Sequence, residues 1–188
     1  MNWPFIVFAG LLLGTGLMRL LELAVSIRRM RANPASVVRE PRLFPAMALL
    51  HFGLVFAPLA EVYFFARPFL WPLGGGALVV LGLATVLRYW TLRTIGRAWN
   101  VRVVKPSDDA IATTGPYAFI RHPNYLVVIL EIAALPLLHS AWVSALTLSL
   151  LNAAVLYQRI RTEEATLAQI PAWRAAMAHR ARLLPGVF

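Results

Sequence analysis

Residues 113–125 read TTGPYAFIRHPNY and separate a long polar segment from an apolar one. A Gly-Pro pair cannot continue a helix, and Pro123 biases His122 toward an extended backbone. The stretch, which we call the elbow, therefore predicts a fixed turn that presents His122, Asn124 and Tyr125 at the start of a hydrophobic segment. A simpler interpretation is that Asn124 only caps a helix, because a helix start needs one such residue.

The composition is that of a membrane protein. Of 188 residues, 60% are hydrophobic, against about 45–50% in soluble domains, and the mean hydropathy is +0.68. The net charge of +10 favours basic loops beside membrane helices over nucleic-acid binding. Cysteine is absent, which excludes disulfides and thiolate chemistry. The four histidines lack metal-ligand spacing, so we expect no metal site.

The apolar runs predict an all-α polytopic membrane protein with about five transmembrane helices, since about 20 residues cross the hydrocarbon core. The last two helices form a hairpin, and the final one continues out of the membrane. We expect one domain, residues 1–188, with 1–92 as a three-helix scaffold and 93–188 as the cofactor-binding and catalytic part. The expected spans are 3–27, 44–65, 71–92, 125–138 and 142–157.

Two features inside the spans carry structural expectations. Gly10 and Gly14 form a small-xxx-small pair, which predicts close helix packing. Arg88 lies near the end of the third run and is expected to extend its guanidinium to the interface, or to pair with Glu131.

The loop charges predict an orientation. The connector after the first span, the segment 93–121 and the carboxyl-terminal tail are basic, whereas the other connections carry little positive charge. Since basic loops remain on the cytoplasmic side, we expect the amino terminus outside, with the elbow and the carboxyl terminus in the cytoplasm.

Arg159 and Glu163 form the second half of the candidate site. They are four residues apart on an expected continuous helix, so they share a face. An exposed ion pair of this kind is common and contributes under about 1 kcal/mol. However, the pair lies where the helix leaves the membrane, on the side of the elbow. There Arg159 can orient an anionic substrate through its bidentate fork, and Glu163 can hold an ammonium group.

Together these motifs resemble the isoprenylcysteine carboxyl methyltransferase family. The resemblance spans roughly residues 95–185 and depends on the Gly-Pro-Tyr and Arg-His-Pro-Asn-Tyr segments of the elbow, a hairpin, and then Arg159 with Glu163-Glu164 and Leu167. In the tail, Pro171 and Trp173 stand where the family usually has Phe-Gly and two tyrosines, so closure of the tail over the cofactor is expected to differ.

The resemblance implies a methyltransferase that uses S-adenosylmethionine and acts on a lipophilic or prenylated acceptor among membrane lipids. It places Arg159 opposite the substrate carboxylate. The residues that it implies for the cofactor pocket are Tyr117, His122, Pro123, Asn124, Tyr125 and Glu163.

Other functions stay open at this point. The foremost prediction is carboxyl O-methylation of an isoprenylcysteine-type substrate. The first alternative is a phenolic lipid or quinone precursor, whose hydroxyl would need Arg159 or His122 because a phenol ionises near pH ~10. The second is an NADPH-dependent sterol-type reductase with a similar elbow. The third is a scaffold or small transporter that relies on the intramembrane charges Glu61, Arg88 and Glu131.

Overall fold

Helices make up the protein, as expected for an all-α chain. The computed structural model describes residues 3–32, 43–96, 99, 101 and 111–185. These residues contain no strand, only one isolated bridge between Ile120 and Ala181. The elements are α1 (Trp3–Ala32), α2 (Leu43–Phe64), α3 (Trp71–Ile95), the 3-10 helix η3 (Gly115–Ala118), α4 (Pro123–Leu137), α5 (Trp142–Leu167) and α6 (Pro171–Met177).

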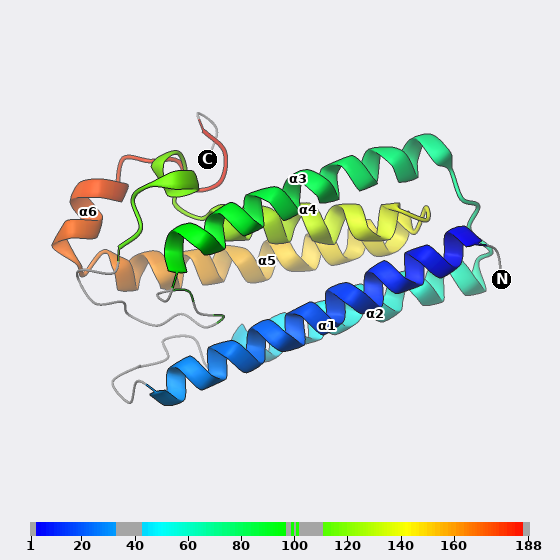
Figure 1. Cartoon of the computed structure of the whole chain (residues 1–188), viewed down its shortest axis with the longest axis horizontal. Helices are drawn as coiled ribbons and strands as arrows, with labels where there is room; N and C mark the ends of the chain where they lie inside the picture. Colours follow the sequence, from blue (N-terminus) through cyan, green and yellow to red (C-terminus); the bar gives the residue numbers. More distant parts are fainter. Residues whose placement is uncertain (1–2, 33–42, 97–98, 100, 102–110, 186–188) are drawn as a thin grey trace.

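Four helices, α1, α2, α3 and α5, are long and apolar enough to cross a membrane. The fifth apolar helix, α4, has only 15 residues, about 22 Å at 1.5 Å per residue. The five run side by side in alternating directions, while α6 and the elbow lie together at one end (Figure 1). The prediction of a polytopic helical protein is therefore confirmed, with α4 shorter than a full span.

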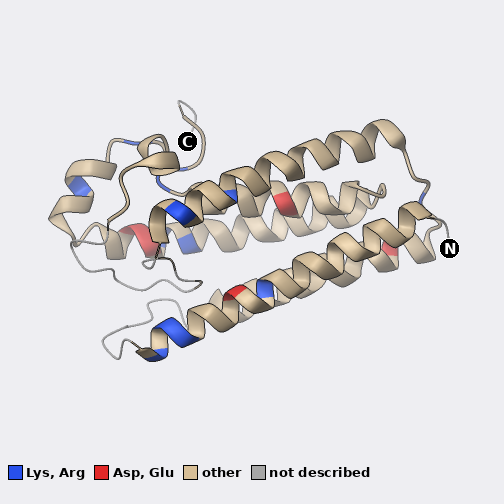
Figure 2. Cartoon of the chain, viewed as in Figure 1, with Lys and Arg blue, Asp and Glu red and all other residues tan. Residues whose placement is uncertain are grey.

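Two helices continue past their predicted ends. α1 reaches Ala32 and α3 reaches Ile95, because arginine and similar residues extend a helix after its apolar run ends. Parts of the basic connector after α1 and of the polar segment 93–121 lie outside the described residues. Charged side chains are sparse along the helices and gather toward the elbow end (Figure 2).

Helices α1 and α2 pack closely at Gly16. A Cβ there would lie 2.9 Å from Val55 Cγ2, whereas a Cβ on Gly10 or Gly14 would meet nothing within 4 Å in the described part of the chain. The prediction of close packing at Gly10 and Gly14 is therefore wrong within this chain. The apolar run alone does not show which face of α1 meets its neighbour.

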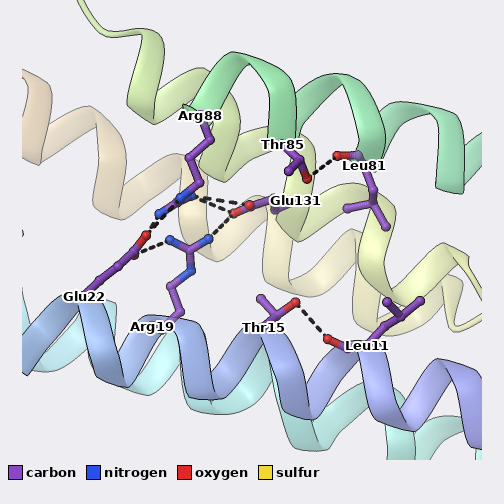
Figure 3. A network of polar contacts seen from close by, with 8 residues as sticks. All are labelled: Leu11, Thr15, Arg19, Glu22, Leu81, Thr85, Arg88 and Glu131. Carbon is purple, nitrogen blue, oxygen red and sulfur yellow. Dashed lines mark hydrogen bonds and ion pairs between the residues drawn. The ribbon is translucent and has the colours of Figure 1, made fainter. Parts of the chain in front are cut away.

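A group of four charged residues joins α1 to α3 and α4 in the middle of the bundle (Figure 3). Arg88 is 6% exposed and bonds to Glu22 at 2.8 Å and to Glu131 at 3.2 Å. Arg19 completes the group, with bonds of 2.6 Å to Glu22 and 2.7 Å to Glu131. We call these four residues the intramembrane ion network.

The network corrects one expectation and confirms another. Arg88 does not extend to the interface, but it does pair with Glu131. Two cations and two anions satisfy one another, which offsets the cost of burying each charge. The backbone of α1 packs mainly on α2, and the network joins α1 to α3 and α4 beside the apolar contacts that Phe8 and Leu12 make in the core.

Glu61 acts at the opposite end of the bundle from the elbow. Its carboxylate accepts the backbone N–H groups of Val143 and Ser144 at 3.2 and 2.6 Å, and it pairs with Arg67 at 3.0 Å. These N–H groups open α5 and have no partner within the helix. Glu61 therefore caps the amino-terminal end of α5, which is a structural role. The transporter interpretation had instead given this charge a function in transport.

Candidate functional site

The elbow is built from a tight turn followed by a proline-initiated helix. Gly115 has a φ of +56°, and a Cβ on it would lie 2.5 Å from Thr94 Oγ1, so glycine alone fits. Pro123 opens α4, where the missing N–H costs no helical bond. His122 is the residue that precedes the helix, and Asn124 lies in its first turn. The interpretation of Asn124 as a helix cap is therefore wrong.

The carboxyl-terminal tail docks along the elbow. The backbone N–H groups of Arg121 and His122 donate to the carbonyls of Ala181 and Arg182, at 2.9 and 3.0 Å. The Arg121 guanidinium also donates to the Arg180 carbonyl at 2.7 Å. Segments some 60 residues apart in sequence are thus held together mainly by backbone groups, which a sequence pattern does not reveal.

Glu164 joins the elbow, α5 and the tail. It accepts from Arg121 at 2.9 Å and from Arg182 at 3.0 Å, and it lies 3.3 Å from His122 Nε2. The bond to Glu164 raises the pKa of Arg182 above that of a free arginine. Sequence reasoning quoted Glu164 only as part of a motif. The signal for a separate role was its position beside Glu163, because consecutive helical residues point in different directions.

Arg159 and Glu163 meet at one hydroxyl group. Arg159 Nε donates to Tyr125 Oη at 2.7 Å, and the same hydroxyl donates to the Glu163 carboxylate. His122 stacks on Tyr125 with ring centroids 5.2 Å apart, and its Nδ1 lies 3.9 Å from Glu163 Oε1. The expected shared face is confirmed, with Tyr125 as the link between the two charges.

A cavity of about 620 Å³ opens beside this group. All the predicted site residues line it except Pro123, which is buried behind the turn. From the elbow the cavity continues between helices past apolar side chains. The elbow-end residues are Tyr117, His122, Asn124, Tyr125, Arg159, Glu163 and Trp173, and the apolar ones include Leu13, Leu17, Phe52, Phe56 and Val128.

Hydrogen-bond acceptors face the elbow end of the cavity. Asn124 Oδ1 is buried without a partner in the described part of the chain, and the Glu163 side chain remains 27% exposed. Burial and the Glu163 carboxylate raise the pKa of Tyr117, so its hydroxyl stays neutral. Among the described residues, no three His, Asp or Glu side chains are grouped to hold a metal ion. This end suits a ligand that carries positive charge and hydrogen-bond donors.

The tail closes one side of the cavity. Pro171 begins α6 and does not simply end α5, and Trp173 and Met177 of α6 both line the cavity. Trp173, Ile170 and Met177 are buried together with Tyr117, and Arg121 lies 5.9 Å from the centre of the Trp173 ring. The departure at Pro171 and Trp173 therefore produces a short docked helix.

Comparisons with known proteins show the family of the chain. Residues 77–169 match the family model of the isoprenylcysteine carboxyl methyltransferase (ICMT) family. The chain is also 35% identical, over 125 residues, to the uncharacterized protein YpbQ of Bacillus subtilis (strain 168), covering 66% of this chain and 73% of the relative. With four membrane-length helices and a cavity lined by the matched region, this chain belongs to the isoprenylcysteine carboxyl methyltransferase family of membrane methyltransferases.

Proposed function

We propose that this protein transfers a methyl group from S-adenosylmethionine to an acidic oxygen of a lipophilic acceptor. One observation carries the proposal: a single cavity has hydrogen-bond acceptors at the elbow end and mainly apolar walls between the helices, where Arg19, Glu22 and Arg88 also line it. In this scheme residues 93–188 form the cofactor-binding and catalytic part. Residues 1–92 are the scaffold, and they supply much of the apolar wall.

The elbow end fits the cofactor's polar groups. Glu163 accepts from its ammonium group, and the unpartnered Asn124 Oδ1 accepts from a hydroxyl or amino group. The flat rings of Tyr117, His122 and Trp173 offer surfaces against which its base can pack. Pro123 fixes the turn, and Tyr125 holds the Glu163 carboxylate in place. When bound, the cofactor supplies an electrophilic methyl carbon.

Arg159 is the residue that we assign to the acceptor. It is 4% exposed, its Nε is fixed by Tyr125, and it lines the elbow end of the cavity. Its positive charge stabilises an oxyanion there and holds it in line with the methyl group. Methyl transfer is a displacement, so alignment and exclusion of water supply most of the acceleration. A carboxylate acceptor is already ionised at neutral pH and needs no base.

We further propose that the elbow, the tail and the cofactor site lie on the cytoplasmic side. Basic side chains gather at this end of the bundle (Figure 2), which the positive-inside rule associates with the cytoplasm. The acceptor then enters from the lipid through the apolar part of the cavity. An isoprenylcysteine carboxylate and an alkylphenol are the two acceptors to compare.

Ligand binding to the detergent-purified protein tests the function. Calorimetry with S-adenosylmethionine, S-adenosylhomocysteine and NADPH should show binding of both adenosyl ligands and not of NADPH. Transfer of a labelled methyl group to either acceptor would then establish the reaction. Binding of NADPH alone would indicate a reductase, and a folded sample that binds none of the three would overturn the proposal.

A further inference from the structure

His51 of α2 lines the cavity and has no role in the scheme above. Its Nδ1 lies 2.8 Å from the Met47 backbone carbonyl. Because a carbonyl oxygen can only accept, Nδ1 must carry the hydrogen. In the neutral ring the lone pair is then on Nε2, for which the described part of the chain shows no hydrogen-bonding partner. The backbone bond thus fixes the tautomer and leaves Nε2 as the atom that can take a proton.

The position of His51 relative to Arg159 makes this atom relevant. Arg159 contacts the Met47 thioether, and His51 follows Met47 by one helical turn on the same face of α2. The charged groups that act on the imidazole are Arg19 from α1, Glu131 from α4 and Arg159 from α5. Since Arg159 and His51 also line one cavity, an acceptor oxygen bound by Arg159 lies on the side of α2 that carries His51.

The other histidine of the cavity is less suited to take a proton. His122 lies between two carboxylates, with Nε2 3.3 Å from Glu164 and Nδ1 3.9 Å from Glu163. Both ring nitrogens of His122 therefore face carboxylates of α5, and neither is directed at the apolar part of the cavity. His122 also stacks on Tyr125 at the elbow end, whereas His51 lines the cavity from the transmembrane helix α2.

We propose that His51 is the general base of the reaction and that the acceptor is a lipid with a weakly acidic hydroxyl, a phenol or an enol. The inference rests on the proposed function and narrows its acceptor. The acceptor O–H bond breaks and its proton goes to His51 Nε2, while the oxygen forms the bond to the methyl carbon. The electron pair of the broken sulfur–carbon bond stays on the sulfur, giving S-adenosylhomocysteine. A carboxylate acceptor would leave this base unused.

The first test observes the acceptor without the cofactor. An alkyl nitrophenol, whose phenolate absorbs visible light, is bound to the purified protein and titrated with acid and base. In the wild type the phenolate band should appear at a pH lower by about one unit or more than in His51→Gln. The matched control His179→Gln removes an exposed histidine of the tail and should titrate like the wild type. An equal midpoint in wild type and His51→Gln, or no binding to the wild type, would overturn the proposal.

The second test compares the two acceptors in methyl transfer. His51→Gln should lower turnover of an alkylphenol by about 10²-fold at neutral pH, with recovery at a pH where the phenol ionises by itself. Turnover of any carboxylate acceptor should change far less. Equal losses with both acceptors, or a loss that persists at high pH, would assign His51 a structural role. If no acceptor is methylated at all, the proposed function fails, and the nitrophenol titration still decides whether His51 takes the proton.

Discussion

The intramembrane ion network and the elbow both place arginine beside glutamate, but they differ in how completely the carboxylates are satisfied. In the network Glu22 and Glu131 each accept from both Arg19 and Arg88. At the elbow the bonds are unevenly shared. Glu164 accepts from two arginines, whereas Glu163 accepts the Tyr125 hydroxyl and stays partly exposed to the cavity.

This difference separates a structural charge from a functional one. In the intramembrane ion network each carboxylate is shared by two arginines that come from different helices, so the four charges hold α1, α3 and α4 together. An incompletely satisfied carboxylate beside an unpartnered amide oxygen is costly unless a ligand completes it. Intramembrane charge by itself therefore does not identify the site in this protein; the partly exposed Glu163 carboxylate and the unpartnered Asn124 Oδ1 on one cavity do.

The largest effect is expected from breaking the network. Arg88→Leu leaves Glu22 and Glu131 with Arg19 as their remaining arginine partner and should cost about 3–5 kcal/mol of unfolding free energy. Equilibrium unfolding of the detergent-solubilised wild type and variant measures this loss of unfolding free energy. The control Arg161→Leu changes an arginine whose described contact is the exposed Tyr157 and should stay within about 0.5 kcal/mol. Similar losses for both variants would mean that the network does not tie α1 to the bundle.

Arg159→Ala should affect chemistry more than binding. Removing the cation that faces the acceptor oxygen is expected to lower turnover by about 10²-fold, with S-adenosylmethionine affinity changed by less than about threefold. Single-turnover kinetics and calorimetry separate the two quantities. Arg159→Lys keeps the charge but not the planar fork, so it should recover part of the rate. Equal losses of affinity and turnover would place Arg159 in the cofactor site instead.

Substitution of the neighbouring residues Glu163 and Glu164 tests whether one carboxylate binds the cofactor while the other holds the tail. Glu163→Gln should weaken S-adenosylmethionine binding by about 10–100-fold, the value of one hydrogen bond to a charged group, with thermal stability little changed. Glu164→Gln should instead loosen the tail, because Arg121 and Arg182 lose their shared anion. Limited proteolysis near residues 171–185 detects that change. If Glu164→Gln weakened binding as much as Glu163→Gln without exposing the tail, the two carboxylates would not have separate roles.

The sequence predicted those parts of the fold that depend on local chemistry. Apolar runs placed the long helices, and the prolines of the elbow placed the start of α4. The i,i+4 spacing put Arg159 and Glu163 on one face, but Tyr125 joins them through a contact between helices. Such contacts depend on how helices rotate against one another, which hydropathy does not determine.

For the same reason the sequence left two positions open for Arg88 and gave no separate role to Glu164 or His51. Arg88 could reach the interface or turn inward, and only the position of Glu22 on another helix decides between these. Glu164 is satisfied by a tail that follows it in sequence and folds back. His51 stood in an apolar run with no motif, and its bond to the Met47 carbonyl is visible only in the folded helix.

The smallest effect is expected from substitution of Tyr117. It tests whether the Glu163 carboxylate is the group that binds the positive charge of the ligand, without a second anion from Tyr117. Burial and the nearby Glu163 carboxylate raise the pKa of Tyr117 above its ordinary value, so the hydroxyl should stay neutral through the usual assay range. Tyr117→Phe should therefore change S-adenosylmethionine affinity by less than about threefold, equally at pH 7 and pH 9, as measured by calorimetry. A wild-type rise in affinity toward pH 9 that vanished in Tyr117→Phe would show a second anion at the elbow end. The ligand's positive charge would then be shared between two groups, and the effect expected for Glu163→Gln would have to be smaller.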